Sequence, residues 1–568
     1  MKTKKLEART DARHTRRAVS VMRTLRRSLS LVLSFCTRKK EHIKNKKKFL
    51  IGTEEKKLYA RTFGASTQGV DGLIITVEVD SANGMPAFDV VGLANAAVRE
   101  AKERVRTAIK NSGLRLRQEK VTVNLAPAEV RKESSGLDLP IAIGLLAAQG
   151  KFPAEKCDEF VLISELSLDG KLCAVDGILP MTVTARDNGF KKMIVAKENV
   201  NEALLVENIE VYAPETLIEL VEFLQGEFEL KPATPQPVEE TENFIEIVDD
   251  FSDVQGQFMA KRALEIAAAG GHNVLMVGVP GSGKTMLAKR VSSILPELTH
   301  EEALEVTKIY SVAGKLKRNG GLITKRPFQH PNHDASTAAI IGGGTIPKPG
   351  QVTLAHHGVL FLDELPEFKK NVLEALREPL EERQITVSRI GGTLTFPSSM
   401  ILICAMNPCP CGWYGDKDHE CQCTPLEIKR YTRKLSGPLL DRIDIHIRVP
   451  RVKYDELTSK RKAETSAKVR ERVTVARKIQ LERLQKYNLF CNAQMNHAML
   501  NELCILEQDA EKLLEDVFET KKLSARSYDR IIKVGRTIAD LEGGAVEISA
   551  KHIAEAIKLR NDLDFEIK

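Results

Sequence analysis

The sequence predicts an α/β fold in which two α/β regions are followed by a helical region. Three patterns support this: short apolar runs alternate with helical stretches, a glycine-rich loop separates one such run from a helix, and apolar residues recur at helical spacing near the end of the chain. At 568 residues, the chain has room for roughly two to four domains, each with its own core.

The first 57 residues differ from the rest in charge. They hold 19 basic and 5 acidic residues, a net charge of +14, whereas the whole chain carries +8 and residues 58–568 therefore carry −6. The basic balance thus gives no support for nucleic-acid binding by the rest of the chain. We expect residues 1–57 to be a disordered basic arm, a targeting segment or the result of a start codon placed too far upstream. We favour the last, because strand-like patterning begins only near Leu58.

Cysteine usage and hydropathy bear on the compartment. Ten cysteines in a long chain without an export signal predict a reducing cytoplasm rather than a disulfide framework. The apolar patch from Leu29 to Phe35 is too short to span a bilayer, and no other run approaches that length. We therefore expect a cytoplasmic protein.

Residues 58–228 have the pattern of an α/β module. A hairpin turn is expected at Asp169-Gly170, and one helical face at Ala97, Ala101, Val105 and Ala108. Residues 229–250 are predicted to be an exposed linker, since Lys231 to Pro237 is proline-rich and an acidic stretch follows. The expected strands of the module are Leu73–Val79, Val121–Leu125, Phe160–Leu168 and Met193–Ala196.

The remaining chain divides into a core at residues 251–454 and a helical lid at 455–568. Strands and helices alternate in the core in the manner of a parallel sheet. In the lid, apolar residues recur at helical spacing at Val469, Val473, Ala476 and Ile479, and again at Ile531, Val534 and Ile538.

A phosphate-binding loop is predicted between the apolar run Val274–Val277 and a helix at Met286–Leu295. Glycines let backbone N–H groups turn inward around a polyphosphate. Lys284 would reach the β- and γ-phosphates, and the Thr285 hydroxyl would hold Mg²⁺. The sequence thus predicts a nucleoside triphosphate site, with ATP and Mg²⁺ held at Gly278, Val279, Pro280, Gly281, Ser282, Gly283, Lys284 and Thr285.

Two further strands end in polar residues that suit this chemistry. Val359–Leu362 is followed by Asp363, which could anchor the Mg²⁺ shell, and Glu364, which could polarise the attacking water. A strand from Met400 to Ala405 leads to Asn407, whose amide could orient water near the γ-phosphate or simply cap a turn. An arginine delivered by a neighbouring subunit would offset transition-state charge. Spacing alone leaves Arg433, Arg442 and Arg448 open for that role.

Four cysteines cluster close after Asn407. Two Cys-x-Cys pairs are separated by nine residues, a spacing that could close a tetrahedral thiolate site for structural zinc or could leave reduced, unligated thiols. His419 could replace one ligand. A metal here would stiffen the segment after Asn407 rather than catalyse a reaction. The four are Cys409, Cys411, Cys421 and Cys423.

Two stretches are candidate effector loops. Residues 341–350 are rich in glycine and proline, and residues 385–396 predict a hairpin with Gly391-Gly392 at its tip. Ordinary surface turns remain the alternative, because Lys348 and Arg389 are isolated cations.

These motifs together resemble the ComM/YifB-type magnesium-chelatase-like ATPases of the AAA+ class, from about Ala60 to Asp564. The carriers are QGVDG at 68–72, FDVVGL at 88–93, GVPGSGKT at 278–285, GVLFLDELPEF at 358–368, NPCPCG at 407–412, SGPLLDRIDI at 436–445 and RTIADLEG at 536–543. The resemblance implies Asn407 as sensor one, Arg442 as the finger acting on a neighbour's site and Arg526 as sensor two. It also implies a ring, with six subunits expected, that acts on DNA during recombination of incoming DNA. Where the family has an arginine and paired histidines, this chain has residues 328–334 with His330 and His333, so no role is assigned to either.

The N-terminal module resembles the proteolytic domain of Lon-type proteases, a ribosomal S5 domain 2-like fold, at residues 131–140 and 167–171. A serine nucleophile such as Ser134 or Ser135 needs a lysine base, but no lysine occurs between Lys171 and Lys191. A peptidase is therefore not expected.

The sequence favours an ATP-driven motor that acts on single-stranded or branched DNA, by helicase activity or branch migration. Three alternatives are a chelatase-like remodeller of a protein partner, a Lon-like ATP-dependent protease and a nucleotide-gated scaffold. The N-terminal module weighs against the remodeller, since chelatase motor subunits are expected to lack it.

Overall fold

The computed structural model describes residues 59–92, 96–128, 135–235, 250–317, 320–344, 347–389, 392–416, 418–452 and 463–561. The basic segment 1–57, Ser134 and most of the predicted linker lie outside these residues. Within the described chain, no helix combines the length and the apolar composition needed to cross a membrane.

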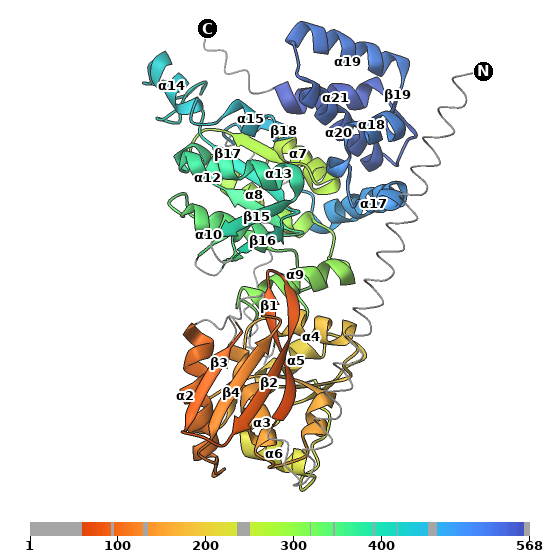
Figure 1. The fold of residues 1–568 in the computed structure, drawn as a ribbon. Helices are drawn as coiled ribbons and strands as arrows, with labels where there is room; N and C mark the ends of the chain where they lie inside the picture. The colour runs from red at the N-terminus through yellow and green to blue at the C-terminus, as the bar shows by residue number, and fades with distance from the viewer. Residues whose placement is uncertain are drawn as a thin grey trace, which may run out of the picture. The chain divides into compact units, whose positions relative to one another are not determined.

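The N-terminal region is built on a mixed seven-stranded sheet in the order β3-β4-β2-β1-β5-β8-β9 (Figure 1). β2 pairs antiparallel with β1 and β4, and the other neighbours are parallel. Apolar side chains of α3 and of the sheet form one buried cluster. The strands are β1 (Tyr59–Gln68), β2 (Asp71–Ala82), β3 (Ala87–Val91), β4 (Lys120–Ala126), β5 (Phe160–Ile163), β8 (Lys192–Val195) and β9 (Glu210–Tyr212), with a small pair β6 (Glu165–Leu166) and β7 (Leu172–Cys173). The helices are α2 (Ala96–Asn111), α3 (Asp138–Ala148), α4 (Ile178–Asp187), α5 (Val200–Ala203) and α6 (Leu217–Gln225).

Most of the strands predicted here are confirmed, but the run Phe160–Leu168 is not one strand. β5 ends at Ile163 because the backbone of Ser164 pairs elsewhere: its N–H donates to Gly136 O, and its C=O accepts from the N–H of Leu139. The predicted turn at Asp169-Gly170 is present between β6 and β7.

Two other predictions for this region have mixed outcomes. In α2, Ala101, Val105 and Ala108 are buried, as the helical spacing predicts. Of the predicted linker, residues 231–235 are irregular and mostly exposed, but the Ala233 N–H donates to Val211 O and ties this stretch to β9.

The central region contains a five-stranded sheet whose strands are all parallel, in the order β11-β14-β17-β10-β18. Every residue of β10, β14 and β17 is buried. The sheet strands are β10 (Val274–Val277), β11 (Phe328–Gln329), β14 (Val359–Leu362), β17 (Ile401–Met406) and β18 (Ile445–Arg448), and two hairpins are β12 (Gly342–Gly343) with β13 (Lys348–Pro349) and β15 (Gln384–Arg389) with β16 (Gly392–Pro397). The helices are α7 (Phe258–Gly270), α8 (Lys284–Arg290), α9 (His300–Val312), α10 (Thr337–Ile341), α11 (Gln351–Leu354), α12 (Lys370–Ala375), α13 (Arg377–Glu382), α14 (Pro425–Thr432) and α15 (Gly437–Leu440).

The predicted parallel sheet is therefore confirmed, and β10 and β14 have the predicted bounds. The helix after the loop was predicted to run from Met286 to Leu295, which is wrong at both ends. α8 begins at Lys284, and after Arg290 the chain tightens into a 3₁₀ helix that extends to Ile294. The hairpin of β15 and β16 is present, with Arg389 opposite Gly392.

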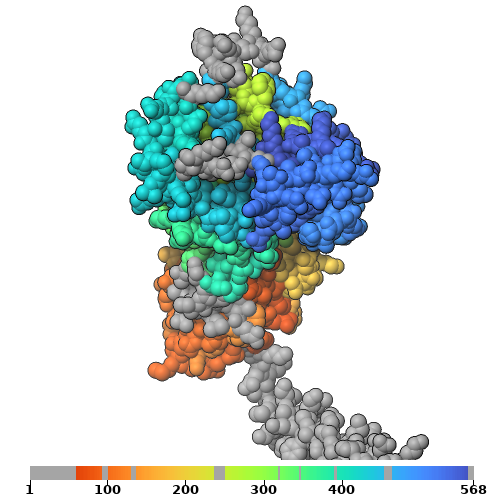
Figure 2. All heavy atoms as spheres, turned by 90° about the horizontal axis from the view of Figure 1, so that it is seen from above, coloured from red at the N-terminus to blue at the C-terminus, as the bar shows by residue number. Residues whose placement is uncertain are grey.

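The C-terminal region is helical, as predicted. Its elements are α17 (Ser466–Leu484), α18 (His497–Leu503), α19 (Gln508–Lys521), α20 (Ala525–Leu541) and α21 (Ala550–Asn561), with a short parallel pair β19 (Ile505–Leu506) and β20 (Glu547–Ile548). Val469, Val473 and Ala476 of α17 pack in one apolar cluster with residues of α7 and β10. Figure 2 shows these helices in blue beside the green and cyan surface of the central region.

Candidate nucleotide-binding site

The glycine-rich loop joins the central strand β10 to helix α8. β10 lies between β17 and β18 and pairs in parallel with both. Gly281 and Gly283 have φ values of +73° and +91°. Glycine adopts this left-handed region without steric cost, so the loop conformation depends on these two residues. The chain turns sharply here and presents successive backbone N–H groups at the end of the sheet.

Lys284 lies at the end of the loop and bridges two elements. Its Nζ donates to Gly278 O at 2.7 Å, to Val279 O at 3.0 Å and to Asn407 Oδ1 at 3.2 Å. Burial lowers the pKa of the Lys284 ammonium, and Asp363 and Glu364 oppose that shift. The structure therefore brings the predicted phosphate-binding lysine and the predicted sensor together.

The residues predicted to hold Mg²⁺ also meet. Thr285 Oγ1 donates to Asp363 Oδ2 at 2.7 Å. Asp363 follows β14 directly, and its Oδ1 accepts the N–H of Glu364 at 2.9 Å. A hydroxyl and a carboxylate oxygen are the hard ligands that Mg²⁺ prefers, so this pair suits that ion. Lys284, Thr285, Asp363 and Asn407 are called the nucleotide edge below.

Glu364 is positioned differently from its neighbour. Its backbone has φ +52°, and its side chain is 59% exposed. The Nδ1 atom of His333 lies 3.8 Å from Glu364 Oε2. His333 had no predicted role, and this contact was not predicted from the sequence. The signal that could have found it is topological, because residues 330–334 follow β11, the parallel neighbour of β14.

The four predicted cysteines converge beside this edge. Their sulfur atoms all lie within 4.8 Å of one another. Cys409 Sγ lies 3.3 Å from Cys411 Sγ and 3.6 Å from Cys421 Sγ. The cluster could hold a tetrahedral metal ion, with Cys423 as the fourth ligand. His419, which was considered as a substitute ligand, instead stacks on Trp413 with the ring centroids 4.2 Å apart.

Arg442 and Arg526 lie together in a different place. They line a cavity of about 330 Å³ with Glu381, and the residues that line it include none of 278–285. The Arg442 guanidinium pairs with the Glu381 carboxylate, and Arg526 Nη2 lies 3.7 Å from Glu381 Oε1. We call this the arginine cavity. One chain therefore gathers both predicted arginines but does not bring them to its own phosphate loop.

The structure also shows where the two other candidate finger arginines, Arg433 and Arg448, lie. Arg433 caps the C-terminal end of α14, and Arg448 is the last residue of β18, opposite Val277 of β10. Arg448 therefore lies next to the loop of its own chain.

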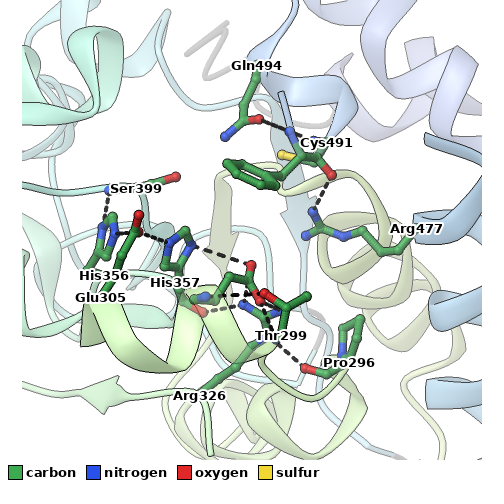
Figure 3. Close-up of polar contacts among 12 residues, drawn as sticks. Pro296, Thr299, Glu305, Arg326, His356, His357, Ser399, Arg477, Cys491 and Gln494 are labelled. Atoms are coloured by element: carbon green, nitrogen blue, oxygen red, sulfur yellow. Dashed lines mark hydrogen bonds and ion pairs between the residues drawn. The ribbon is translucent and has the colours of Figure 1, made fainter. Parts of the chain in front are cut away.

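A histidine and carboxylate cluster that the sequence analysis missed lies where α9 meets the start of β14 (Figure 3). Glu305 Oε2 lies 3.1 Å from His356 Nε2 and 2.8 Å from His357 Nε2. His356 Nδ1 accepts the Ser399 N–H at 3.0 Å. Because a neutral imidazole has one N–H, His356 Nε2 must carry it and donate to Glu305. The cluster is therefore a hydrogen-bond network in which that nitrogen has no lone pair for a metal.

Arg326 extends this network. It donates to the carbonyls of Pro296 at 2.6 Å and His357 at 2.7 Å, and it pairs with Glu302 at 2.9 Å. Figure 3 shows Arg326, Pro296 and His357 pointing toward one another from separate segments. The network thus holds α9 against the start of β14, the strand that Asp363 follows.

Comparisons with known proteins agree with this geometry. Family models match residues 250–457 (magnesium chelatase, subunit ChlI), 77–199 (subunit ChlI of Mg-chelatase) and 463–560 (magnesium chelatase, subunit ChlI C-terminal). Competence protein ComM of Haemophilus influenzae is 43% identical over 503 residues, which cover 88% of this chain and 97% of that protein. The uncharacterized protein YifB of Escherichia coli is 42% identical over 498 residues, or 87% and 95% of the two chains. Lon protease 2 of Bacillus subtilis is 31% identical over 145 residues, 24% of this chain and 26% of that protein.

Fold and site together define a phosphate-loop protein of the magnesium-chelatase type, a class whose family suggests ATPase activity with Mg²⁺. With the relatives covered almost end to end, the chain belongs to the ComM/YifB-type magnesium-chelatase-like proteins.

Proposed function

We propose that this protein is a ring-forming, ATP-hydrolysing motor that acts on DNA in the cytoplasm. The observation that carries the proposal is the nucleotide edge, where Lys284, Thr285, Asp363 and Asn407 meet at one end of a parallel sheet. The relation to a protein named for competence supports a role with incoming DNA, such as helicase activity or branch migration.

Each residue of the edge has a role in this proposal. Lys284 leaves its carbonyl partners to bind the β- and γ-phosphates of ATP, and Thr285 and Asp363 hold Mg²⁺. The bound Mg²⁺ would neutralise charge on the phosphate oxygens. Glu364, exposed at the strand end, accepts a proton from the attacking water. Asn407 orients that water once Lys284 has moved from its amide.

We assign Arg442 as the finger and Arg526 as sensor two, both acting on the nucleotide of a neighbouring chain. Their shared position in the arginine cavity, away from the loop of their own chain, supports this assignment. A site completed by a neighbour requires a ring, for which six subunits are expected. The chain would then comprise a Lon-like α/β module without a peptidase dyad (58–228), a linker (229–250), an AAA+ core (251–454) and a helical lid (455–568). The Lon protease match gives only partial support to the module's assignment.

A groove in the N-terminal region is a candidate contact for DNA. Arg106 and Lys110 from α2, with Arg115 and Arg117 from the following loop, line a cavity of about 620 Å³. All four are exposed, and Glu119 is the one acidic residue of the lining. Since phosphate contacts need cations but no base-specific groups, the groove suits a nucleic-acid backbone. It is a local exception to the acidic balance of residues 58–568.

The groove makes a direct test possible. The double variant Arg115→Glu with Arg117→Glu should weaken DNA binding and reduce the dependence of log K on log[salt] by about two, roughly one per lost cation. Basal ATP hydrolysis should stay unchanged. The matched control is Lys191→Glu with Lys231→Glu, because both lysines are exposed in the same region and neither lines the groove. An equal loss of DNA binding in the two double variants would assign the effect to net charge rather than to the groove.

The chelatase-like remodeller remains the second candidate. The family model described as subunit ChlI of Mg-chelatase matches residues 77–199 of the N-terminal region. A match so described weakens the expectation that this region argues against a chelatase-like function. The protease is disfavoured, because α4, where the base is needed, contains no lysine.

One experiment distinguishes these functions. ATP hydrolysis is measured alone and with single-stranded DNA, branched DNA, a chelatase partner protein or an unfolded protein, for the natural chain and for Glu364→Gln. We expect DNA to stimulate hydrolysis in the natural chain, and Glu364→Gln to abolish it. Glu367→Gln is the matched control, since Glu367 is three residues away and pairs with Lys434. Stimulation only by the chelatase partner would replace the DNA motor with the remodeller.

We also propose that Cys409, Cys411, Cys421 and Cys423 hold a structural zinc ion. The mutual approach of the four sulfur atoms supports this assignment over reduced, unligated thiols.

A further inference from the structure

The segment of residues 407–424 connects the cysteine cluster to the nucleotide edge. Asn407 begins it, the first two cysteines follow within four residues, and α14 begins after it at Pro425. None of the four apolar clusters of the described chain includes a residue of this segment. Burial among the described residues of this segment is confined to Pro408, Cys409 and Gly412 near its start, so another interaction must help to hold the rest in place.

The sulfur geometry fits a bound zinc ion. The distances among Cys409, Cys411 and Cys421 are 3.3, 3.6 and 3.6 Å. A tetrahedral zinc with Zn–S bonds of about 2.3 Å places its sulfur ligands about 3.8 Å apart. A disulfide requires about 2.05 Å, so none of these pairs is bonded as a disulfide. Three thiols at these distances, with the Cys423 sulfur within 4.8 Å of each, are close to the spacing that a single ion imposes.

Backbone donors surround the sulfur atoms. The Tyr414 N–H donates to Cys409 Sγ at 3.3 Å, and the Cys411 N–H donates to Cys423 Sγ at 3.4 Å. Such N–H groups stabilise the negative charge of thiolate ligands and fix their orientation. The segment thus supplies both the ligands and the donors that support them.

Gly412 links the cluster to the phosphate loop. It has φ +89°, and its N–H donates to Cys409 O at 3.0 Å. A Cβ atom at this position would lie 2.6 Å from Pro280 Cγ and 3.9 Å from Asn407 Cγ. The turn between the cysteines therefore packs directly on the phosphate loop and beside the sensor amide, which contacts Lys284.

We infer that the four-cysteine zinc site is a positioning element of the ATP site, which holds Pro280 and Asn407 in place through the turn at Gly412. Loss of the metal releases its four cysteine ligands and the turn at Gly412 that they hold. The phosphate loop at Pro280 and the Asn407 amide then lose their support. ATP then binds more weakly and is hydrolysed more slowly, although no cysteine touches the nucleotide. The inference rests on the proposed ATP site but is independent of the DNA substrate.

The test begins with metal content. The full chain is purified without added metal, and zinc is measured by elemental analysis. One zinc per chain is expected, and Co²⁺ substitution should give the absorption of tetrahedral thiolate coordination. Cys421→Ser should lose most of the zinc, whereas Cys173→Ser, a half-buried cysteine outside the cluster, should keep it. Absence of zinc from the natural chain would overturn the metal site.

The coupling is tested with zinc still bound. Gly412→Ala places a methyl group against Pro280, so we expect normal zinc content but ATP affinity and kcat lowered together by about 10-fold or more. Gly415→Ala is the matched control: it lies in the same segment with φ +80°, and a Cβ added there would meet no atom within 4 Å. Equal behaviour of the two variants, or Cys421→Ser with normal ATP affinity and turnover, would overturn the coupling. These measurements need no DNA, so failure of the DNA proposal would not affect them.

Discussion

The nucleotide edge and the arginine cavity differ in how much of their chemistry one chain completes. At the edge, Lys284 contacts Asn407, and Thr285 contacts Asp363, so the groups proposed to bind phosphate and Mg²⁺ already lie together in one chain. In the cavity, Arg442 and Arg526 face an acidic residue of their own chain, Glu381, and no phosphate-loop residue lines the space. Under the proposed function, one half of the site lies within one chain and a second chain completes the other half.

Arg442→Ala gives the largest expected effect on this comparison. Removal of a finger that offsets transition-state charge should lower kcat by about 10³-fold. ATP binding should change little, because the nucleotide edge of the same chain is intact. Turnover and binding of a fluorescent ATP analogue measure the two separately, and Arg433→Ala is the control. Unchanged turnover in Arg442→Ala would contradict a site shared between chains.

Mixing of variants sharpens the same prediction. A Glu364→Gln chain lacks the proposed general base but keeps Arg442, and an Arg442→Ala chain keeps Glu364 but lacks the finger. In mixed rings, some sites combine an intact Glu364 with an intact Arg442 from the neighbour, so activity should reappear although each variant alone is inactive. No recovery on mixing would place Arg442 on its own chain's site.

The sequence could predict the edge because parallel strands end at the same side of a sheet. Apolar runs of strand length, Val274–Val277 and Val359–Leu362, fixed where the polar residues Thr285 and Asp363 would meet, and the cysteine spacing fixed the cluster. The partner of Arg442 could not be predicted. Glu381 lies 61 residues away on α13, and no pattern in sequence links a helix end to a distant turn.

Two local features were also beyond the sequence. The break of the predicted strand after Ile163 depends on two hydrogen bonds: the Ser164 N–H donates to Gly136 O, and the Leu139 N–H donates to Ser164 O. Tertiary folding brings these residues together. His333 received no role because its segment departs from the family pattern, yet the position of β11 beside β14 brings its ring near Glu364. In both cases long-range contacts, rather than local propensity, decide the outcome.

β18 follows Asp444 of the cavity and ends beside the phosphate loop, and its His446 makes stability depend on pH. Burial lowers the pKa of His446 in β18 to about 3, and Arg560 of α21 and Arg530 of α20 also lower it, while Asp444 opposes them. In the unfolded chain the pKa of His446 is near 6.5. Between pH 6.5 and about 3, His446 therefore binds a proton in the unfolded chain but not in the folded one. The free energy of unfolding should therefore fall as pH decreases below about 6.5, by up to about 1.4 kcal/mol per unit from this group.

Urea unfolding between pH 7 and 4 measures this slope. The variant His446→Gln removes the titrating group, so its slope should be shallower than that of the natural chain by this amount. The difference between the two chains isolates His446 from other buried histidines such as His272, whose pKa burial also lowers. Identical slopes would contradict the assignment.

His333→Ala tests whether His333 positions Glu364, and its expected effect on kcat is smaller than that of Arg442→Ala. The imidazole lies 3.8 Å from Glu364 Oε2 and restricts the position of that exposed carboxylate. Loss of this neighbour should lower kcat by roughly 3- to 10-fold with little change in KM, since misplacement of a catalytic group affects the chemical step. His330→Ala is the control, because its ring packs on Phe361 instead. A change in KM alone would assign His333 to ATP binding.

The smallest expected effect concerns Glu381, and it tests the arginine cavity itself. If the pair between Glu381 and Arg442 must break before a neighbour's nucleotide is reached, then Glu381→Gln favours the ring. Ion pairs with an exposed partner are worth about 0–1 kcal/mol, and the Glu381 side chain is 46% exposed, so the protein concentration at half-maximal ATPase activity should fall by no more than about fivefold. Glu382→Gln, the next residue on α13, controls for the loss of one charge. A higher half-maximal concentration in Glu381→Gln would mean that Glu381 stabilises the assembled ring. The arginine cavity would then be part of the interface between chains, and the pair of Glu381 with Arg442 would not have to break on assembly.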